Sequence, residues 1–328
     1  MASSGPQPEL PFSDASPPDH GATSVSKKQG QRVRIGLGIA AISLFAIFMG
    51  SWIWAVFVVI FLVMGFNELT AMMAALNTSP SKFIVLVMGI LMIVVATLNH
   101  PEFLSPLLTI TVVGSFFRLL FRNPVGSMAD IGATLLAVVY LAYFPVHFIM
   151  LRELSTPTYH SIWNWGPYLS PTAPFFQAQP GLGYLVLTIV VVGMSDIAAY
   201  YTGKQFGRSL LYPQVSPKKT REGALGGVLV GFAAGALMSW VIGFPLQHGL
   251  ILSLLLTIVG QIGDLIESVF KRNAGIKDSS ALLQGHGGLL DRMDSYIFSG
   301  VIAYYYIYWI VLGLGLARDI RHAYAVWF

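Results

Sequence analysis

Cysteine is absent from this chain of 328 residues, which excludes disulfides, thiolate metal sites and a cysteine nucleophile. Charged residues are also scarce, at 10%, whereas hydrophobic residues make up 55%. The sequence contains neither the G-x-x-x-x-G-K-[ST] phosphate loop nor the dinucleotide G-x-G-x-x-G, and it shows no internal repeat. Its basic residues are not interleaved with aromatic ones, so no nucleic-acid partner is expected.

What the chain does contain is a series of long apolar runs from residue 35 to its end. The mean hydropathy of +0.68 exceeds what one soluble core can bury. Since roughly 20 apolar residues cross the hydrocarbon of a bilayer and free backbone groups are not tolerated there, these runs predict membrane-spanning helices. We therefore predict an all-α, polytopic integral membrane protein embedded in the lipid bilayer. Nine spans are expected, at about 35–50, 52–67, 83–99, 103–121, 130–151, 182–202, 224–246, 249–270 and 294–316.

The first two runs are separated only by Gly50, Ser51 and Trp52, so two spans joined by a tight hairpin and one bent helix both fit. Residues 1–34 are rich in Ser, Pro, Gly and Gln and poor in bulky apolar residues, which predicts a disordered tail.

Lys and Arg predict the orientation, because they favour cytoplasmic loops. Four of them precede the first span (Lys27, Lys28, Arg32 and Arg34), which places the N-terminal tail inside. With nine crossings the 203–223 and 271–293 segments are also cytoplasmic, while residues 152–181 form an extracytoplasmic loop. The net charge of +4 then reflects cytoplasmic loops and a phosphate-rich partner.

Residues 268–294, which we call the signature segment, concentrate charge in a chain that otherwise avoids it. Ser268, Lys271 and Arg272 end one apolar run, and further ionisable residues and glycines follow: Lys277, Asp278, Gly285, His286, Gly287, Gly288, Asp291, Arg292 and Asp294. Asp291 and Asp294 are three apart at the start of a span, so both carboxylates can point to one site.

A second polar cluster lies between the sixth and seventh spans. It contains Asp196, Ala199, Tyr200, Gly203, Lys204, Gly207, Arg208, Ser216, Pro217, Lys218, Lys219, Thr220, Glu222, Gly223, Gly226 and Gly227. A third element, Gly263-Asp264 with Glu267, lies within the eighth span. Carboxylates within a span cost several kcal/mol unless they are paired or line a polar cavity. Oxygen ligands without Cys or a His pair favour Mg²⁺ over zinc.

The two clusters together resemble the phosphatidate cytidylyltransferase family. The strings that carry the resemblance are S-x-x-K-R, K-D and H-G-G-x-x-D-R-x-D in the signature segment, and D-x-x-A-Y-x-x-G-K-x-x-G-R with S-P-K-K-T-x-E-G-x-x-G-G upstream. This family usually has Pro where the chain has Gln284. The resemblance covers about residues 182–300, whereas the first half matches only as generic spans.

The resemblance implies an enzyme that joins CTP to phosphatidate, giving CDP-diacylglycerol and pyrophosphate, in a bacterial plasma membrane. Residues 182–317 would form the catalytic transmembrane domain, after N-terminal helices at 35–151 and before a short tail at 318–328. A magnesium ion would be held by Asp264 and Asp291, a second cation is compatible with the pattern, and a homodimer is left open. Catalytic roles would belong to Lys271, Arg272, Lys277, Asp278, His286, Arg292 and Asp294, and substrate binding to Lys204, Arg208, Ser216, Lys218, Lys219, Glu222, Gly287 and Gly288.

Other interpretations of the same residues remain open. His286 could cap a turn, the basic residues of the 203–223 segment could anchor the membrane interface, and Asp264 could pair with Lys271 or Arg272 without a metal. A CTP-dependent kinase or cytidylyltransferase acting on a polyprenol or archaeal lipid would need similar groups. A cation-coupled transporter could also use intramembrane carboxylates, although it would be expected to show paired halves and broken spans.

Overall fold

The protein is helical almost throughout in the computed structural model, which describes residues 45–121, 126–155, 173–277, 279–280 and 288–314. The helices are α2 (Ser51–Ala74), α3 (Lys82–Thr97), α4 (Leu104–Phe121), α5 (Met128–Val138), α6 (Val146–Glu153), α7 (Ala173–Ala178), α8 (Pro180–Phe206), α9 (Arg221–Ile242), α10 (Leu246–Asn273) and α11 (Leu290–Tyr305). A short 3₁₀ turn, Pro101–Phe103 (η1), precedes α4, and π-helical turns follow α5 (Val139–Tyr143, η2) and α11 (Tyr306–Val311, η3).

Six helices within the described ranges are long and apolar enough to cross a membrane: Trp52–Ala74, Pro101–Phe121, Met128–Glu153, Pro180–Phe206, Arg221–Ile242 and Leu246–Asn273. The helix Lys82–Thr97 is apolar but shorter. The predicted all-α membrane architecture is therefore confirmed, whereas the count of nine stays a prediction. The first predicted span falls largely outside the described residues. Its described end, residues 45–49, is helical and is separated from α2 by Gly50 at a φ of +105°, so this point is a break between helices.

The helix ends follow from local sequence. The hydroxyl of Ser81 accepts a hydrogen bond from the backbone N–H of Ile84 and begins α3. Ser127 and Asp130 form a reciprocal capping box at α5. Thr220 caps α9 through the N–H of Gly223, and α9 ends at Gly243 in the left-handed conformation.

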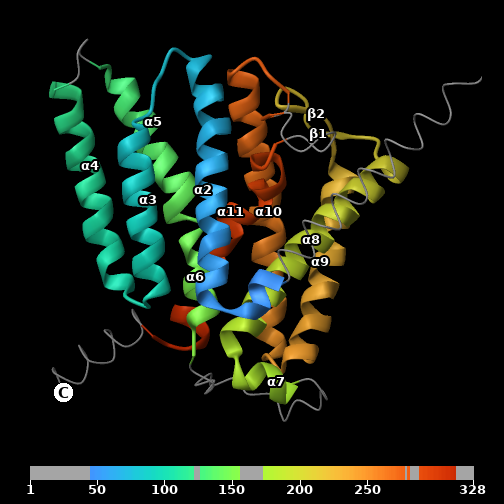
Figure 1. Cartoon of the computed structure of the whole chain (residues 1–328). Helices are drawn as coiled ribbons and strands as arrows, with labels where there is room; N and C mark the ends of the chain where they lie inside the picture. The colour runs from blue at the N-terminus through green and yellow to red at the C-terminus, as the bar shows by residue number, and fades with distance from the viewer. Residues whose placement is uncertain (1–44, 122–125, 156–172, 278, 281–287, 315–328) are drawn as a thin grey trace, which may run out of the picture. The chain divides into compact units, whose positions relative to one another are not determined.

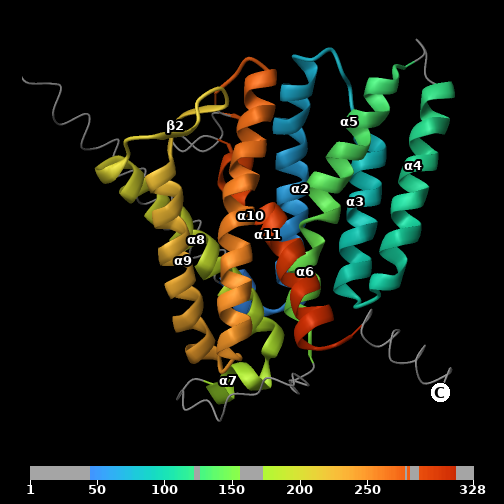
Figure 2. The ribbon, with the colours of Figure 1, turned by 180° about the vertical axis from the view of Figure 1, so that it is seen from behind.

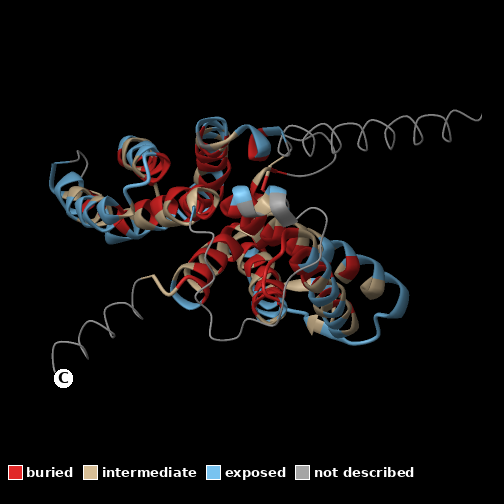
Figure 3. Cartoon of the chain, turned by 90° about the horizontal axis from the view of Figure 1, so that it is seen from below, coloured by how far each residue is buried: buried red, intermediate tan, exposed pale blue. Residues whose placement is uncertain are grey.

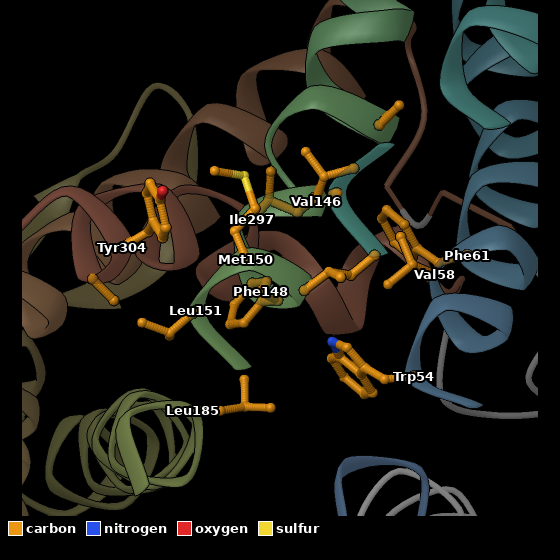
Figure 4. Close-up of a cluster of buried hydrophobic side chains, with 14 of the residues drawn as sticks. Trp54, Val58, Phe61, Val146, Phe148, Met150, Leu151, Leu185, Ile297 and Tyr304 are labelled. Carbon is orange, nitrogen blue, oxygen red and sulfur yellow. The ribbon is translucent and has the colours of Figure 1, made fainter. Parts of the chain in front are cut away.

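The apolar core joins the two halves of the chain. Figure 4 shows Trp54, Val58 and Phe61 of α2 facing Phe148 and Met150 of α6, together with side chains of α8 and α11. Seen along the bundle, buried residues lie where helices meet and exposed residues lie on their outer faces (Figure 3). Large exposed side chains such as Phe117 and Leu120 of α4 are those expected to face lipid tails.

The loop after α8 contains a feature that the sequence analysis did not predict. Strands β1 (Leu210–Tyr212) and β2 (Ser216–Thr220) form a two-stranded antiparallel hairpin with an irregular register. Glu222 fixes its base, because its carboxylate accepts hydrogen bonds from the backbone N–H groups of Arg208 and Ser209, at 3.1 and 3.2 Å. Figures 1 and 2 show this hairpin beside the end of α10, at the same end of the helices as the start of α11.

Candidate active site

A polar pocket of about 710 Å³ lies between α8, the hairpin, the start of α9, α10 and the start of α11. We call it the polar pocket. Its charged lining residues are Asp196, Lys204, Lys218, Lys219, Asp264, Lys271, Asp291, Arg292 and Asp294, and its uncharged polar lining includes Tyr200, Ser216, Thr220, Gln261 and Ser295. The structure therefore brings the signature segment and the second polar cluster together at one site, as their chemistry requires.

The approach of α10 to α11 depends on Gly263. A β-carbon at this position would lie 2.5 Å from the backbone oxygen of Asp294 and 3.0 Å from the ring of Phe298. Only glycine allows that approach without displacement of backbone. As a result Asp294 and Asp264 line the same pocket from two adjoining helices. On the α8 side, Ser295 donates a hydrogen bond of 3.2 Å to Asp196.

The hairpin supplies the cation for Asp264. Lys219 Nζ lies 2.5 Å from Asp264 Oδ2, and both side chains are about one-third exposed or less. The alternative in which Asp264 pairs with Lys271 or Arg272 is not the arrangement seen. Lys218, Lys204 and Arg292 line the same pocket, so several cations converge on one set of carboxylates.

Lys271 is held between two carboxylates. Its ammonium lies 2.5 Å from Asp291 Oδ1 and 3.3 Å from Glu267 Oε1, and only 10% of its side chain is exposed. The spacing of four residues between Glu267 and Lys271 places both on one face of α10. Since buried charges are stable only when they are paired, Glu267 and Asp291 together fix the lysine at the edge of the pocket.

Asp291 also accepts hydrogen bonds from other parts of the signature segment. Its Oδ2 accepts hydrogen bonds from the N–H of Ser279 at 3.0 Å, the hydroxyl of Ser279 at 3.0 Å and the N–H of Gly288 at 2.8 Å. With Lys271, four donors converge on this carboxylate. To act as a metal ligand, Asp291 would have to release at least one of them.

Some predicted site residues lie elsewhere. Arg208, Glu222, Arg272, Lys277 and Gly288 are not part of the pocket lining. Arg272 instead donates to the backbone oxygens of Val215 and Ile276, at 3.2 Å each, and so ties α10 to the turn of the hairpin. Lys277 is exposed. Asp278, His286 and Gly287 lie outside the described residues.

The sequence analysis missed Glu68 of α2, which is 5% exposed and accepts hydrogen bonds from residues 279–280 and 289–290 of the signature segment. One signal could have indicated it. Glu68 is the sole carboxylate between residues 35 and 101, and an isolated charge inside an apolar run is expensive unless it has a partner.

The donor set of the pocket fits a hard cation. Asp264 and Asp294 offer neighbouring carboxylate oxygens, and Asp196 and Gln261 line the same cavity. Across the described ranges no group of three or more His, Cys, Asp and Glu side chains forms a metal site by itself. This pattern suits Mg²⁺, which commonly takes one or two carboxylates and completes its shell with water and substrate phosphate.

Residues 30–310 match the family model of the Cytidylyltransferase family. The chain belongs to this family. A phosphatidate cytidylyltransferase of Synechocystis sp. is 34% identical over 286 residues, which cover 83% of this chain and 93% of the relative. The match to the Bacillus subtilis phosphatidate cytidylyltransferase is 34% over 171 residues, or 52% of this chain and 55% of the relative. That to the Staphylococcus haemolyticus enzyme of the same name is 43% over 120 residues, or 36% and 46%.

The family model matches more of the chain than the strings described in the sequence. Those strings cover about residues 182–300, whereas the match to the family model begins before α2 and so includes the first half of the chain. The contact of Glu68 with the signature segment gives a physical reason why this half belongs to the same unit.

Proposed function

We propose that this membrane protein is a phosphatidate cytidylyltransferase, which joins CTP and phosphatidate to give CDP-diacylglycerol and pyrophosphate. The observation that carries the proposal is the polar pocket, in which cations of the hairpin and of the signature segment meet carboxylates of α8, α10 and α11. A triphosphate needs this combination, and the Synechocystis relative, whose match covers 83% of this chain, is named a phosphatidate cytidylyltransferase.

The reaction asks for positioning and charge neutralisation more than for proton transfer. A phosphate oxygen of phosphatidate forms a bond to the α-phosphorus of CTP while the bond from that phosphorus to the bridging oxygen of the β-phosphate breaks, and pyrophosphate leaves. A phosphate monoester is already an anionic nucleophile, so no strong general base is required. Lys204, Lys218 and Arg292 line the pocket and would neutralise the charge on the phosphate oxygens.

Lys271 is the cation with the most fixed position. Because it is held between Glu267 and Asp291, its ammonium can point to a phosphate without reorganisation when substrate binds. We assign it to charge on the substrate phosphates.

We further propose that Mg²⁺ binds at Asp264 with Asp294. Asp291, the second ligand predicted from the sequence, lines the same pocket but would have to release a hydrogen bond to bind the ion. The ion would neutralise nonbridging oxygens and assist departure of pyrophosphate. Lys219 forms an ion pair with Asp264 and neutralises its charge. When the ion binds, the lysine would release Asp264 and turn toward the substrate.

The active site is assigned to the cytoplasmic face of a bacterial inner membrane. Lys82 begins α3 and Arg118 lies in the last turn of α4, whereas Arg152 lies in the last turn of α6. Figure 1 shows the start of α3 and the end of α4 at the same end of the bundle as the hairpin, and the end of α6 at the opposite end. This asymmetry follows the positive-inside rule. CTP is available only on that side, and phosphatidate reaches the pocket from the bilayer.

The decisive experiment gives purified protein CTP labelled at the α-phosphate, with phosphatidate, in the presence and absence of Mg²⁺. We expect magnesium-dependent transfer of the label to the lipid fraction and release of unlabelled pyrophosphate. A lipid kinase would leave the label in water-soluble CDP, and that outcome would reject the proposal. Parallel reactions with a polyprenyl phosphate would reveal a different lipid acceptor.

A further inference from the structure

Glu68 is a buried carboxylate in the part of the chain that lacks the family strings. It lies near the end of α2 and does not line the polar pocket. Four hydrogen bonds converge on it, and all of them come from the signature segment. Ser279 and Ser280 donate through their hydroxyls at 2.9 and 2.6 Å, and Leu289 and Leu290 donate through their backbone N–H groups at 2.8 and 2.9 Å.

These donors lie on both sides of residues 281–287. Two precede this stretch and two follow it, so one carboxylate joins residues 279–280 to residues 289–290. The N–H groups of Leu289 and Leu290 belong to the beginning of α11, whose own N-terminal residue supplies no side-chain cap. Glu68 therefore supplies that cap from another helix, and its negative charge lies at the positive end of the α11 dipole.

Ser279 connects Glu68 to the pocket. Its hydroxyl lies 2.9 Å from Glu68 Oε2 and 3.0 Å from Asp291 Oδ2, and its single proton is shared between these two acceptors. Asp291 in turn holds Lys271 at 2.5 Å. A continuous chain of polar contacts thus runs from Glu68 through Ser279 and Asp291 to a lysine that lines the pocket.

Gly288 shows how closely these parts pack. A β-carbon at this position would collide with the Ser279 hydroxyl and with the Glu68 carboxylate. Its N–H also donates to Asp291. The last glycine of the G-H-G-G string therefore makes room for Glu68, so packing alone requires a glycine at this position.

We infer that Glu68 is a positioning residue of the active site: it fixes the signature segment at residues 279–280 and 289–290 and, through Ser279 and Asp291, sets the position of Lys271. The inference rests on the proposed function, because Lys271 is taken to act on substrate phosphate. A displacement of about 1 Å in such a group can cost about 100-fold in rate. The N-terminal helices are accordingly part of the catalytic unit.

The test measures kcat and KM of the full-length protein after Glu68→Gln, with kcat expressed per folded enzyme. The amide keeps the shape but presents an NH₂ group to donors that need an acceptor, and it removes the charge that caps α11. We expect kcat to fall about 10-fold to 100-fold, as for other residues that orient a primary ligand. Ser279→Ala removes the same link and should lower kcat similarly, and the double variant should be no worse than the more affected single one.

Glu153→Gln, at the end of α6 and outside the pocket lining, is the matched control and should keep normal kinetics. If Glu68→Gln lowers thermal stability but leaves kcat within twofold of the unmodified protein, Glu68 is only a structural residue and the inference is wrong. If that variant does not fold, Ser279→Ala decides, and an unchanged kcat there overturns the inference. Inactivity of the unmodified protein would instead reject the proposed function, so the two failures are distinct.

Discussion

At the scale of single residues, the site is defined by which cation pairs with each carboxylate. Asp264 forms an ion pair with Lys219, and Asp291 with Lys271, so each of the two metal ligands predicted from the sequence is paired with a different lysine. The neighbour of Asp264 is Asp294, through the close approach at Gly263. The two candidate metal pairs can be separated by experiment, because they predict different responses to magnesium.

Replacement of Asp264 or Asp294 by Asn should lower kcat at least about 100-fold, since each change removes a ligand charge at the reacting phosphates. The residual activity should also need more Mg²⁺ for half-maximal rate. Asp291→Asn should lower kcat as well, by releasing Lys271, but should leave the magnesium requirement unchanged. A magnesium titration of the three variants checks this. An increased requirement in Asp291→Asn would instead place Asp291 on the ion, and normal activity in all three would remove the metal assignment.

Gly288→Ala should destabilise the protein by about 1–3 kcal/mol, because the added methyl group overpacks the contact between Ser279 and Glu68. Thermal unfolding of the purified variants in detergent measures this. The control is Gly114→Ala in α4, where the added methyl group would meet no described atom within 4 Å apart from its chain neighbours and the backbone of its own helix. That change should be neutral or slightly stabilising, since alanine is favoured over glycine inside a helix. Equal melting temperatures for both variants would contradict the packing described for Gly288.

At the scale of elements, the hairpin holds basic residues of the 203–223 segment against the pocket, where Lys218 and Lys219 form part of the lining. Sequence analysis identified its lysines but expected only a loop. Its strands are three and five residues long, and Glu222 and Arg272 hold it by hydrogen bonds to its backbone. Such short strands carry little signal in the sequence, because their stability comes from these tertiary contacts.

Joint replacement of Lys218 and Lys219 by Gln should raise the KM for CTP at least about tenfold or lower kcat correspondingly, because both side chains line the pocket and two charges facing the phosphates are lost. Steady-state kinetics with varied CTP measures the effect. The same pair of changes at Lys27 and Lys28, in the predicted N-terminal tail, serves as the control and should have little effect. Equal and small effects at both pairs would indicate that the hairpin lysines only anchor the membrane interface and do not bind CTP.

At the scale of the whole molecule, every part of the polar pocket must lie on the side of the membrane that holds CTP. Because the natural chain has no cysteine, single cysteines report topology without background. Ser209 and Asn273 are exposed residues at the pocket end, and Ser155 is exposed at the opposite end. All three lie outside the pocket lining.

Cysteine at Ser209 or at Asn273 should resist a membrane-impermeant thiol reagent in intact cells and react after permeabilisation. Cysteine at Ser155 should react in intact cells. Labelling is read on the purified protein, and reaction of the first two after permeabilisation is the control against simple burial. If Ser209 and Asn273 were labelled from opposite sides, the pocket could not form in the membrane and the proposed site would be wrong.

The sequence alone was sufficient for the class of the protein. Apolar runs of membrane length predicted helices because a bilayer leaves the backbone no other way to satisfy its hydrogen bonds. The charged strings of the signature segment and of the second cluster indicated a phosphate-handling site, because charge inside an apolar chain is retained only where it is used or paired. Asp264, Lys219 and Lys271 were all found in this way. The reaction itself came from the resemblance of these strings to a known family.

Only the tertiary structure decided which of these charges meet. The contacts between Lys219 and Asp264 and between Glu68 and Leu290 join residues that are distant in the sequence, and no helical periodicity links them. Helix packing set these distances, through close approaches such as that at Gly263. Local sequence determines whether a segment is helical and apolar, whereas the partner of a buried charge depends on which helices pack together, and that is a property of the whole chain.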